Sequence, residues 1–201
     1  MPATNEKQQA WLVAGLGNPG TEYERTPHNL GFLAVDRLAE RHAIRVTRKE
    51  ANSLVGLGEV KGQPVVLVKP QTFMNVSGPA VKLLLDKYEL PPSQLLLVYD
   101  ELALPWGQLR IRPKGSSAGH NGVKSVIRST GTEEFARLRL GIHPGHPLGD
   151  SAKFVLEPMR KSQGKELDEM LDRAADAIES TLAEGVEKAM AIYNGSLRPR
   201  L

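Results

Sequence analysis

The sequence predicts a single α/β domain, built on a mixed and twisted β-sheet that is flanked by helices. Its 201 residues, 40% of them apolar, suit one domain with one sizeable core. Short apolar runs that are typical of strands alternate with stretches of helical spacing, as in layered α/β domains. One pair of runs is joined by three residues, which indicates a hairpin and makes the sheet mixed. We expect the domain to span residues 11–194, with flexible tails at 1–10 and 195–201.

The first half of the chain is expected to supply three strands and two helices. Strands are predicted where apolar residues run together, at 11–17, 53–60 and 64–70. Apolar residues recur at helical spacing from about His28 to His42, so we expect a helix with His28 in its first turn, where backbone N–H groups are free. A second helix is predicted at 79–90, and the prolines that follow end it.

The second half is expected to supply three more strands and two more helices. The strand at 94–101 ends abruptly in Asp100, and helices are predicted at 123–130 and at 164–194, the latter broken at Gly185. In the strands at 108–115 and 135–142, basic residues alternate with apolar ones. This alternation predicts half-buried strands with four outward side chains, those of Arg110, Arg112, Arg137 and Arg139.

The composition excludes several classes of protein. The chain has no cysteine, which excludes disulfides, a thiolate nucleophile and thiolate metal ligands, and is typical of a reducing cytoplasm. No apolar run approaches the roughly 20 residues that span a bilayer, and the polar first ten residues do not resemble a signal peptide. We therefore expect a cytoplasmic protein and, because no apolar seam is left over, a monomer.

Positive charge is concentrated just after the middle of the chain. The whole chain has a formal charge of +3, whereas residues 101–145 hold seven basic and three acidic residues. A local excess of this kind can bind the phosphates of a nucleic acid. An ordinary solvated surface would give the same count, so charge alone leaves both interpretations open.

A glycine motif after the first strand suggests a nucleotide site that the flanking sequence does not support. Gly15, Gly17 and Gly20 satisfy G-x-G-x-x-G. A dinucleotide-binding motif of this type opens directly into an amphipathic helix, but here the polar segment TEYERTP follows. No predicted strand ends in an acid at the expected spacing, and we expect no nicotinamide cofactor.

Polar side chains gather at the ends of the predicted elements. They are Asn18, His28-Asn29, Asn75, Asp100-Glu101 and His120-Asn121. Sites in open α/β sheets form at strand ends, so we expect these loops to converge on one site. A neutral histidine can activate water, and a buried carboxylate can fix its tautomer. Helix capping and turn formation are the structural alternatives for the same residues.

Four segments of the sequence closely resemble bacterial peptidyl-tRNA hydrolases. They occur in the matching order and read VAGLGNPGTEYERTPHNLGF, KPQTFMNVSG, VYDELALPWGQLRIRPKG and AGHNG. The resemblance extends from about Trp11 to Asn194. It implies a mixed-sheet α/β domain, no metal and no cofactor. It also implies hydrolysis of the ester that joins an N-acylated amino acid or peptide to tRNA, which returns the tRNA to translation.

The resemblance also assigns roles to residues of the cleft. It implies that His28 is the general base and that Asp100 hydrogen-bonds to it, with Glu101 pointing to the opposite face of the strand. Asn18 and Asn121 would hold substrate, water or the oxyanion close to the base, and the division of work among the asparagines stays open. The remaining residues would bind substrate: Tyr23, Met74, Asn75 and His120.

A basic clamp for the 5′ phosphate of tRNA is implied on the predicted strand at 108–115. Arginine forks suit phosphate oxygens. The residues that match this clamp and its surroundings are Arg110, Arg112, Lys114 and Arg139. The histidines at 143 and 146 are spaced like metal ligands, but no carboxylate cluster accompanies them, and we expect them to be loop residues that hold no metal.

Two alternatives come from other classes of protein. A non-catalytic RNA-binding protein on the same fold would keep the basic strand but could lose the base, and the presence of His28, Asp100 and the asparagines favours an enzyme. A serine esterase is disfavoured because the chain has no G-x-S-x-G elbow. The loop GSSAGHNG, Ala103 and Tyr99 depart from the family pattern, but none of these departures removes a proposed catalytic group.

Overall fold

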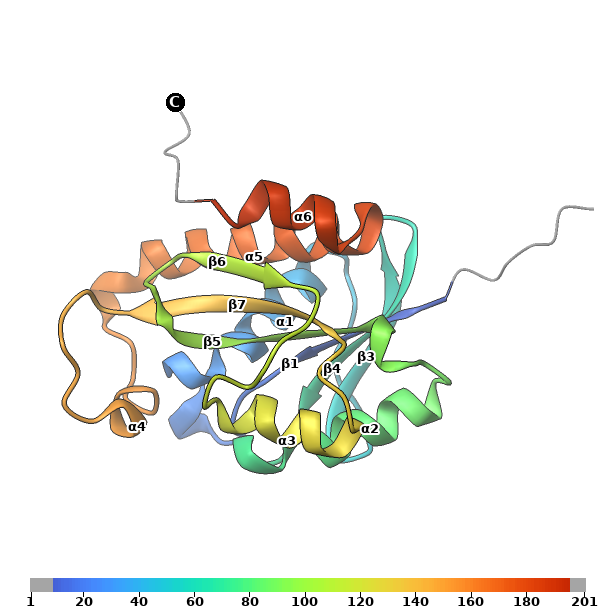
Figure 1. Cartoon of the computed structure of the whole chain (residues 1–201), viewed down its shortest axis with the longest axis horizontal. Helices are drawn as coiled ribbons and strands as arrows, with labels where there is room; N and C mark the ends of the chain where they lie inside the picture. The colour runs from blue at the N-terminus through green and yellow to red at the C-terminus, as the bar shows by residue number, and fades with distance from the viewer. Residues whose placement is uncertain (1–8, 196–201) are drawn as a thin grey trace, which may run out of the picture.

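Seven strands form one mixed β-sheet within residues 9–195, the part of the chain that the computed structural model describes (Figure 1). In chain order they are β1 (Trp11–Gly15), β2 (Arg48–Glu50), β3 (Ser53–Val60), β4 (Gln63–Pro70), β5 (Leu95–Pro105), β6 (Leu109–Arg112) and β7 (Ala136–His143). Across the sheet the order is β2-β3-β4-β1-β5-β7-β6. The four central strands are parallel and the outer ones antiparallel, which confirms the predicted mixed sheet.

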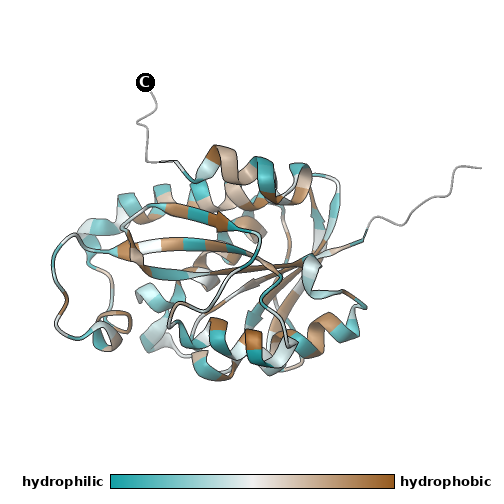
Figure 2. Cartoon of the chain, in the orientation of Figure 1, coloured by the Kyte–Doolittle hydropathy of each residue, from teal (hydrophilic) through white to brown (hydrophobic). Residues whose placement is uncertain are grey.

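Helices cover both faces of this sheet. One face packs against α1 (Leu30–Arg41), α5 (Gly164–Glu184) and α6 (Val186–Tyr193). The other face packs against α2 (Ser77–Lys87) and α3 (Asn121–Thr130). Figure 1 shows α5 and α6 above the sheet and α2 and α3 below it, and Figure 2 shows apolar residues concentrated along the strands between them. Within the described residues no helix is long and apolar enough to cross a membrane.

Alternation along the strands explains why the sheet has two apolar cores. In β1, Val13 joins the core under α1 and α5, while Leu12 and Ala14 join the core over α2 and α3. Successive side chains of a strand point to opposite faces. A strand that is apolar at every position is therefore buried on both sides, as β1 is.

Most predicted elements are present within a few residues of their expected bounds. The helix predicted to the end of the domain is indeed broken at Gly185, whose φ of 93° is in a range that suits glycine. β5 extends four residues past its predicted end. Among the strands and α-helices of residues 9–195, two were not predicted, β2 and the short helix α4 (Ser151–Phe154), because three or four residues are too few to show a periodicity. The flexible tails expected at 1–10 and 195–201 lie almost entirely outside the described residues.

The predicted position of His28 in the first turn of a helix was wrong in one respect. His28 lies in a separate 3-10 turn, Pro27–Asn29, and α1 begins only at Leu30. Its backbone N–H is not free but donates to the carbonyl of Val155 at 3.0 Å. This bond joins the turn to the segment that contains α4 and fixes the backbone from which the His28 side chain projects.

Close approach at Gly31 brings the start of α1 against the sheet. A Cβ atom at Gly31 would lie 2.4 Å from the backbone nitrogen of Leu16 and 2.4 Å from the carbonyl oxygen of Val98. Only glycine leaves room for this contact of the helix with the residue that follows β1 and with the middle of β5. The turn that carries His28 is therefore placed directly beside the residues that follow β1 and end the buried part of β5.

Arg137 is buried, so the prediction that its side chain points outward was wrong. It is 2% exposed, and its guanidinium donates to the carbonyl oxygens of Ser116 at 3.1 Å and Glu133 at 2.9 Å. The guanidinium also lies over the ring of Phe135, 4.4 Å from its centroid. Burial lowers the pKa of Arg137 from its ordinary value. The alternation of β7 was correctly predicted, but the loops that cover Arg137 were not visible in the strand pattern.

Candidate active site

A cleft of about 650 Å³ opens beside the end of β1 and the middle of β5. The predicted loops do converge here, because all eight residues expected in a cleft line it. They are Asn18, Tyr23, His28, Met74, Asn75, Asp100, His120 and Asn121. These residues come from separate stretches of sequence, and the sheet brings them to one place.

His28 and Asp100 form a partly buried, hydrogen-bonded pair in the cleft. The Nδ1 atom of His28 is 3.0 Å from each carboxylate oxygen of Asp100. The His28 side chain is 13% exposed and that of Asp100 is 3% exposed. An ionised carboxylate only accepts hydrogen bonds, so Nδ1 of His28 carries the proton. The Nε2 atom of the neutral ring is then left as an acceptor, as a general base requires.

His120 hydrogen-bonds to the same carboxylate and is locked in the opposite tautomer. Its Nδ1 caps α3 by accepting from the backbone N–H groups of Gly122 at 3.2 Å and Val123 at 3.3 Å. The proton of the neutral ring is therefore on Nε2, which lies 3.0 Å from Oδ1 of Asp100. Both ring nitrogens of His120 are thus used within the protein, although its ring still lines the cleft.

The two histidines keep Asp100 ionised. Burial alone would raise the pKa of this carboxyl group, but the electrostatic attraction and hydrogen bonds of the N–H groups of His120 and His28 outweigh burial and hold its pKa well below the usual range. A carboxylate in this state both orients His28 and stabilises the cation that forms when His28 takes up a proton. Asp100 therefore orients His28 and stabilises its cation, and it does not itself take up or release a proton.

The same three side chains have the composition of a two-histidine, one-carboxylate metal site. One ring nitrogen of His28, one of His120 and a carboxylate oxygen of Asp100 lie within 4.8 Å of one another. A metal ligand must offer a lone pair, however, and Nε2 of His120 carries a proton as long as its Nδ1 caps α3. Metal binding would therefore cost the helix cap, and the group fits a hydrogen-bonded catalytic pair better than a metal centre.

Asn18 is held so that its amino group is left for the cleft. Its Oδ1 accepts from the backbone N–H of Met74 at 2.7 Å, which fixes the orientation of the amide. Its backbone is fixed by Asn29, whose side chain accepts from the N–H of Asn18 at 2.8 Å and donates to its carbonyl at 2.9 Å. Among the described residues the Nδ2 group of Asn18 has no partner, so this donor is available to a ligand.

Asn75 and Asn121 present their amides at the rim of the cleft. Asn75 lies in a 3-10 turn, Met74–Val76, and Asn121 is the first residue of α3. Both are exposed, and within residues 9–195 neither amide makes a hydrogen bond. Tyr23 lies in another short turn that lines the cleft, half-buried. The cleft thus holds a base with three amide groups that can donate around it.

Sequence reasoning missed the residues that form the apolar wall of the cleft. Ser151, Val155 and Leu156, in and after α4, line it, and so does Phe73. Phe73 and Leu156 are large apolar side chains with exposures of 60% and 41%. Phe73 stands out as an aromatic residue within a polar interruption, but α4 carries no sequence signal of a site.

The four residues expected to bind tRNA lie outside the cleft, on and after β6 and on β7. Arg110 pairs in register with Arg139, and Arg112 with Arg137, so four arginines share one face of two adjacent strands. Within residues 9–195, Arg110 and Arg112 form no ion pair, whereas Lys114 is 3.1 Å from Glu134.

Arg139 is tied to the cleft by Glu101. The Nε of Arg139 donates to Oε2 of Glu101 at 2.8 Å, and Glu101 also accepts from the backbone N–H of Ala103 at 2.9 Å. Glu101 thus turns to β7 while Asp100 turns to the histidines, in agreement with the alternation predicted for this strand. Arg139 is only partly exposed, with a side-chain exposure of 19%.

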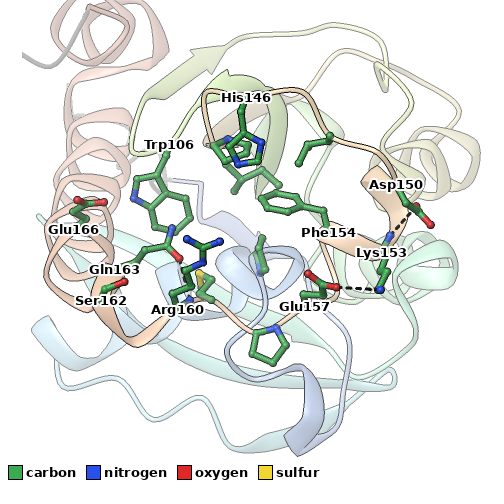
Figure 3. Close-up of a pocket in the computed structure, with 16 residues that line it drawn as sticks. Trp106, His146, Asp150, Lys153, Phe154, Glu157, Arg160, Ser162, Gln163 and Glu166 are labelled. Atoms are coloured by element: carbon green, nitrogen blue, oxygen red, sulfur yellow. Dashed lines mark hydrogen bonds and ion pairs between the residues drawn. The ribbon is translucent and has the colours of Figure 1, made fainter.

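A second cavity of about 710 Å³ lies next to α4, whose residues Lys153 and Phe154 line it (Figure 3). Trp106, Phe154 and His146 line it, and its charged side chains include Lys153 and Glu157, 3.6 Å apart. It is slightly larger than the cleft around His28, but none of the eight predicted residues lines it. Its histidine and its acidic side chains form no hydrogen bond with one another, so it holds no pair like that of His28 and Asp100. The cleft around His28 therefore remains the candidate active site, although it is slightly smaller.

The side chains of His143 and His146, at and after the end of β7, make only local contacts. Nδ1 of His143 accepts from the N–H of Gly145 at 3.0 Å, and Nδ1 of His146 is 3.1 Å from the carbonyl oxygen of Pro147. Among the described residues neither belongs to a group of side chains that could hold a metal ion. The prediction that they are loop residues agrees with the position of His146 but was wrong for His143, which is the last residue of β7 and pairs in register with Pro105.

Comparisons with known proteins identify the family to which this cleft belongs. The family model described as peptidyl-tRNA hydrolase matches residues 12–200. A peptidyl-tRNA hydrolase of Solibacter usitatus is 59% identical over 92% of this chain and 94% of its own, and one of Carboxydothermus hydrogenoformans is 49% identical over 92% and 98%. The crystal structure of peptidyl-tRNA hydrolase from Acinetobacter baumannii matches with a TM-score of 0.85 at 33% identity, covering 94% of this chain and 96% of that one.

Proposed function

Because the chain belongs to the peptidyl-tRNA hydrolase family, it hydrolyses the ester between peptide and tRNA, and we propose that His28 activates the water that cleaves this bond. The observation that carries the proposal is the pair formed by Nδ1 of His28 and the ionised carboxylate of Asp100. This pair leaves Nε2 of His28 as an acceptor in a cleft that three asparagine amides surround.

The first chemical step is attack of water on the ester carbonyl. Nε2 of His28 takes one proton from the water while the oxygen bonds to the carbonyl carbon, and the carbonyl oxygen becomes an oxyanion. Asp100 stabilises the imidazolium that forms. The tetrahedral intermediate then collapses, the bond to the ribose oxygen breaks, and His28 returns the proton to that oxygen. The products are a peptide with a free carboxylic acid, which releases its proton to solvent, and a tRNA with a free 3′-terminal ribose.

The oxyanion needs hydrogen-bond donors that are fixed before the reaction. The amino group of Asn18 is such a donor, because the bonds to Met74 and Asn29 fix both its amide and its backbone. Asn121 stands at the start of α3, next to His120, and can hold water or the oxyanion. Asn75 lies beside the exposed ring of Phe73, where it can pair with the backbone amides of the peptide.

The basic face of β6 and β7 is proposed to bind the phosphates of tRNA. Arg110 and Arg112 carry charge that no acid neutralises within residues 9–195, and guanidinium forks bind phosphate oxygens in a bidentate manner. Lys114 lies just beyond β6 and adds to the same surface, and Arg139 joins this surface to the cleft through Glu101. His120 can contact the acceptor end only with its ring carbons, since both nitrogens are already used.

The substrate also determines where the protein acts. Peptidyl-tRNA arises during translation, so we place the enzyme in the cytoplasm. We further propose that it acts as a monomer, because one chain suffices to bring the base, its carboxylate and the asparagine amides together.

The proposed function is tested by comparing two tRNA esters that differ only at the amino group. Purified protein is incubated with N-acetyl-aminoacyl-tRNA and, in parallel, with the free aminoacyl-tRNA. We expect release of the N-acetyl amino acid while the free ester is largely spared. Tight binding of tRNA without cleavage of either ester would contradict the proposal and favour a non-catalytic RNA-binding protein. Equal cleavage of both would contradict the assignment of an N-acylated substrate.

A further inference from the structure

The outer edge of β6, the strand that carries Arg110 and Arg112, is hydrogen-bonded by one asparagine side chain near the end of the described residues. β6 is the last strand of the sheet, so one side of its backbone has no neighbouring strand. On that side Oδ1 of Asn194 accepts from the N–H of Ile111 at 2.6 Å, and Nδ2 of Asn194 donates to the carbonyl oxygen of Ile111 at 3.0 Å. One amide thus pairs with both backbone groups of one residue, as a neighbouring strand would.

The position of Ile111 decides what this contact controls. Ile111 is fully buried beneath α6, and the residues on either side of it are Arg110 and Arg112. Since successive side chains alternate, both arginines project from the opposite face. The backbones of these two residues face β7, because antiparallel neighbours alternate in the direction of their hydrogen bonds. Asn194 therefore holds the strand at the midpoint between these two cations.

Asn194 is itself held firmly enough to act in this way. Its backbone N–H donates to the carbonyl of Met190 at 3.1 Å, which continues the last turn of α6. α6 is anchored to the core by Ala189, which is fully buried. The contact spans 83 residues of sequence, so it couples the end of the chain to a strand in its middle.

We propose that Asn194 is a positioning residue for tRNA binding, which keeps Arg110 and Arg112 in the arrangement that fits phosphate. This inference rests on the proposed role of β6 as the phosphate-binding strand. Asn194 touches neither the cleft nor the reacting atoms. Its loss weakens recognition of tRNA and leaves the chemical step unchanged.

The test is a double-mutant cycle with N-acetyl-aminoacyl-tRNA as substrate. Arg112→Ala is expected to raise KM roughly tenfold, because a guanidinium that binds phosphate is removed. Asn194→Ala is expected to raise KM on the order of threefold to tenfold, with kcat changed less than about twofold. The double variant is expected to show a smaller increase than the product of the two single increases, because the second change acts through the first.

Two controls separate positioning from general loss of structure. Ile192→Ala removes an exposed side chain two residues earlier and is expected to leave KM unchanged. Hydrogen exchange of the Ile111 amide is expected to accelerate in Asn194→Ala and not in Ile192→Ala. Asn194→Gln keeps the amide on a longer arm and is expected to raise KM less than alanine does. If the alanine variant does not fold, the glutamine variant still tests whether Asn194 positions the arginines of β6.

The outcomes distinguish the inference from the function on which it rests. If Arg112→Ala leaves KM unchanged, the phosphate-binding role of β6 fails and the inference fails with it. If Arg112→Ala raises KM and Asn194→Ala does not, only the positioning role of Asn194 fails. Fully multiplicative increases would overturn it as well, since they would show that the two residues act independently. A fall in kcat with unchanged KM would assign Asn194 a merely structural role.

Discussion

The cleft around His28 and the basic face of β6 both carry polar side chains, but they differ in how firmly those side chains are held. In the cleft, His28, Asp100 and Asn18 are each fixed by hydrogen bonds from other elements. On β6, the side chains of Arg110 and Arg112 have no ion-pair partner in residues 9–195, and the fold fixes only their backbone.

This difference corresponds to two functions, catalysis in the cleft and phosphate binding on β6. Groups that stabilise a transition state gain most when they are fixed in advance, because reorganisation then costs nothing during the reaction. Cations that bind a flexible polyanion gain from their charge, and their side chains tolerate motion as long as the strand that carries them is held in place. Substitutions in the cleft should therefore lower kcat, and substitutions on β6 should raise KM.

The largest effect is expected from Asp100→Asn. The amide keeps the shape of the side chain but cannot hold Nδ1 of His28 as a donor with the strength of a carboxylate, nor stabilise the imidazolium. We expect kcat to fall on the order of 10²- to 10⁴-fold with little change in KM. Steady-state kinetics on N-acetyl-aminoacyl-tRNA measures both. A rise in KM at constant kcat would place Asp100 with the binding groups instead.

Asn18→Asp is expected to have the next largest effect. Its carboxylate can still accept from the N–H of Met74, but the Nδ2 donor is removed and a negative charge faces the forming oxyanion. We expect kcat to fall on the order of 10²- to 10³-fold. Asn52→Asp, at an exposed turn outside the cleft, is the matched control. Retention of full kcat by Asn18→Asp would remove Asn18 from the oxyanion site.

Removal of both cations from β6 is expected to change binding alone. The double variant Arg110→Ala, Arg112→Ala should raise KM by about tenfold or more while kcat stays constant. The slope of log KM against log salt concentration should decrease by about one for each phosphate that the variant no longer binds. Lys49→Ala, on β2 at the opposite edge of the sheet, is the control. An unchanged salt slope would contradict phosphate binding by β6.

The pH dependence of kcat/KM is the smallest expected effect, but its slope counts the groups that must lose a proton. Because the pKa of Asp100 is held below its usual range, its carboxylate stays ionised between about pH 5 and 8, where histidines titrate. The stabilisation that Asp100 provides is complete above about pH 4, the unfolded pKa, and is lost as pH falls through the folded pKa. We therefore expect log kcat/KM to fall toward acid pH with a slope of one. A slope of two would mean that a second group must also lose a proton.

The sequence predicted which residues meet in the cleft better than it predicted how they are bonded. His28 and Asp100 were paired through a family motif, and all eight residues predicted for the cleft line it. The tautomer of His120 was not predictable, because it depends on how the loop before α3 turns the ring toward both the helix cap and Asp100. The sequence analysis noted Asn29 beside His28, but no pattern in the sequence indicated that its side chain binds the backbone of Asn18.

Long-range contacts explain most of what the sequence did not reveal. Alternation along β7 is the same for Arg137 and Arg139, yet one is buried under loop carbonyls and the other is paired with Glu101. The contact between Asn194 and Ile111 joins residues 83 positions apart, and no local pattern marks it. Propensity and periodicity describe neighbours in sequence, whereas these contacts are set by tertiary packing.

The central claim, that His28 supplies the base in a preorganised cleft, is tested most directly by single-turnover hydrolysis of N-acetyl-aminoacyl-tRNA with wild type and His28→Ala. At saturating enzyme we expect the cleavage rate of His28→Ala to be at least about 10²-fold lower, while the enzyme concentration that gives half-saturation stays the same. A variant that cleaves at the wild-type rate would show that the base is another group. The arrangement of Asp100 around His28 would then need a different explanation.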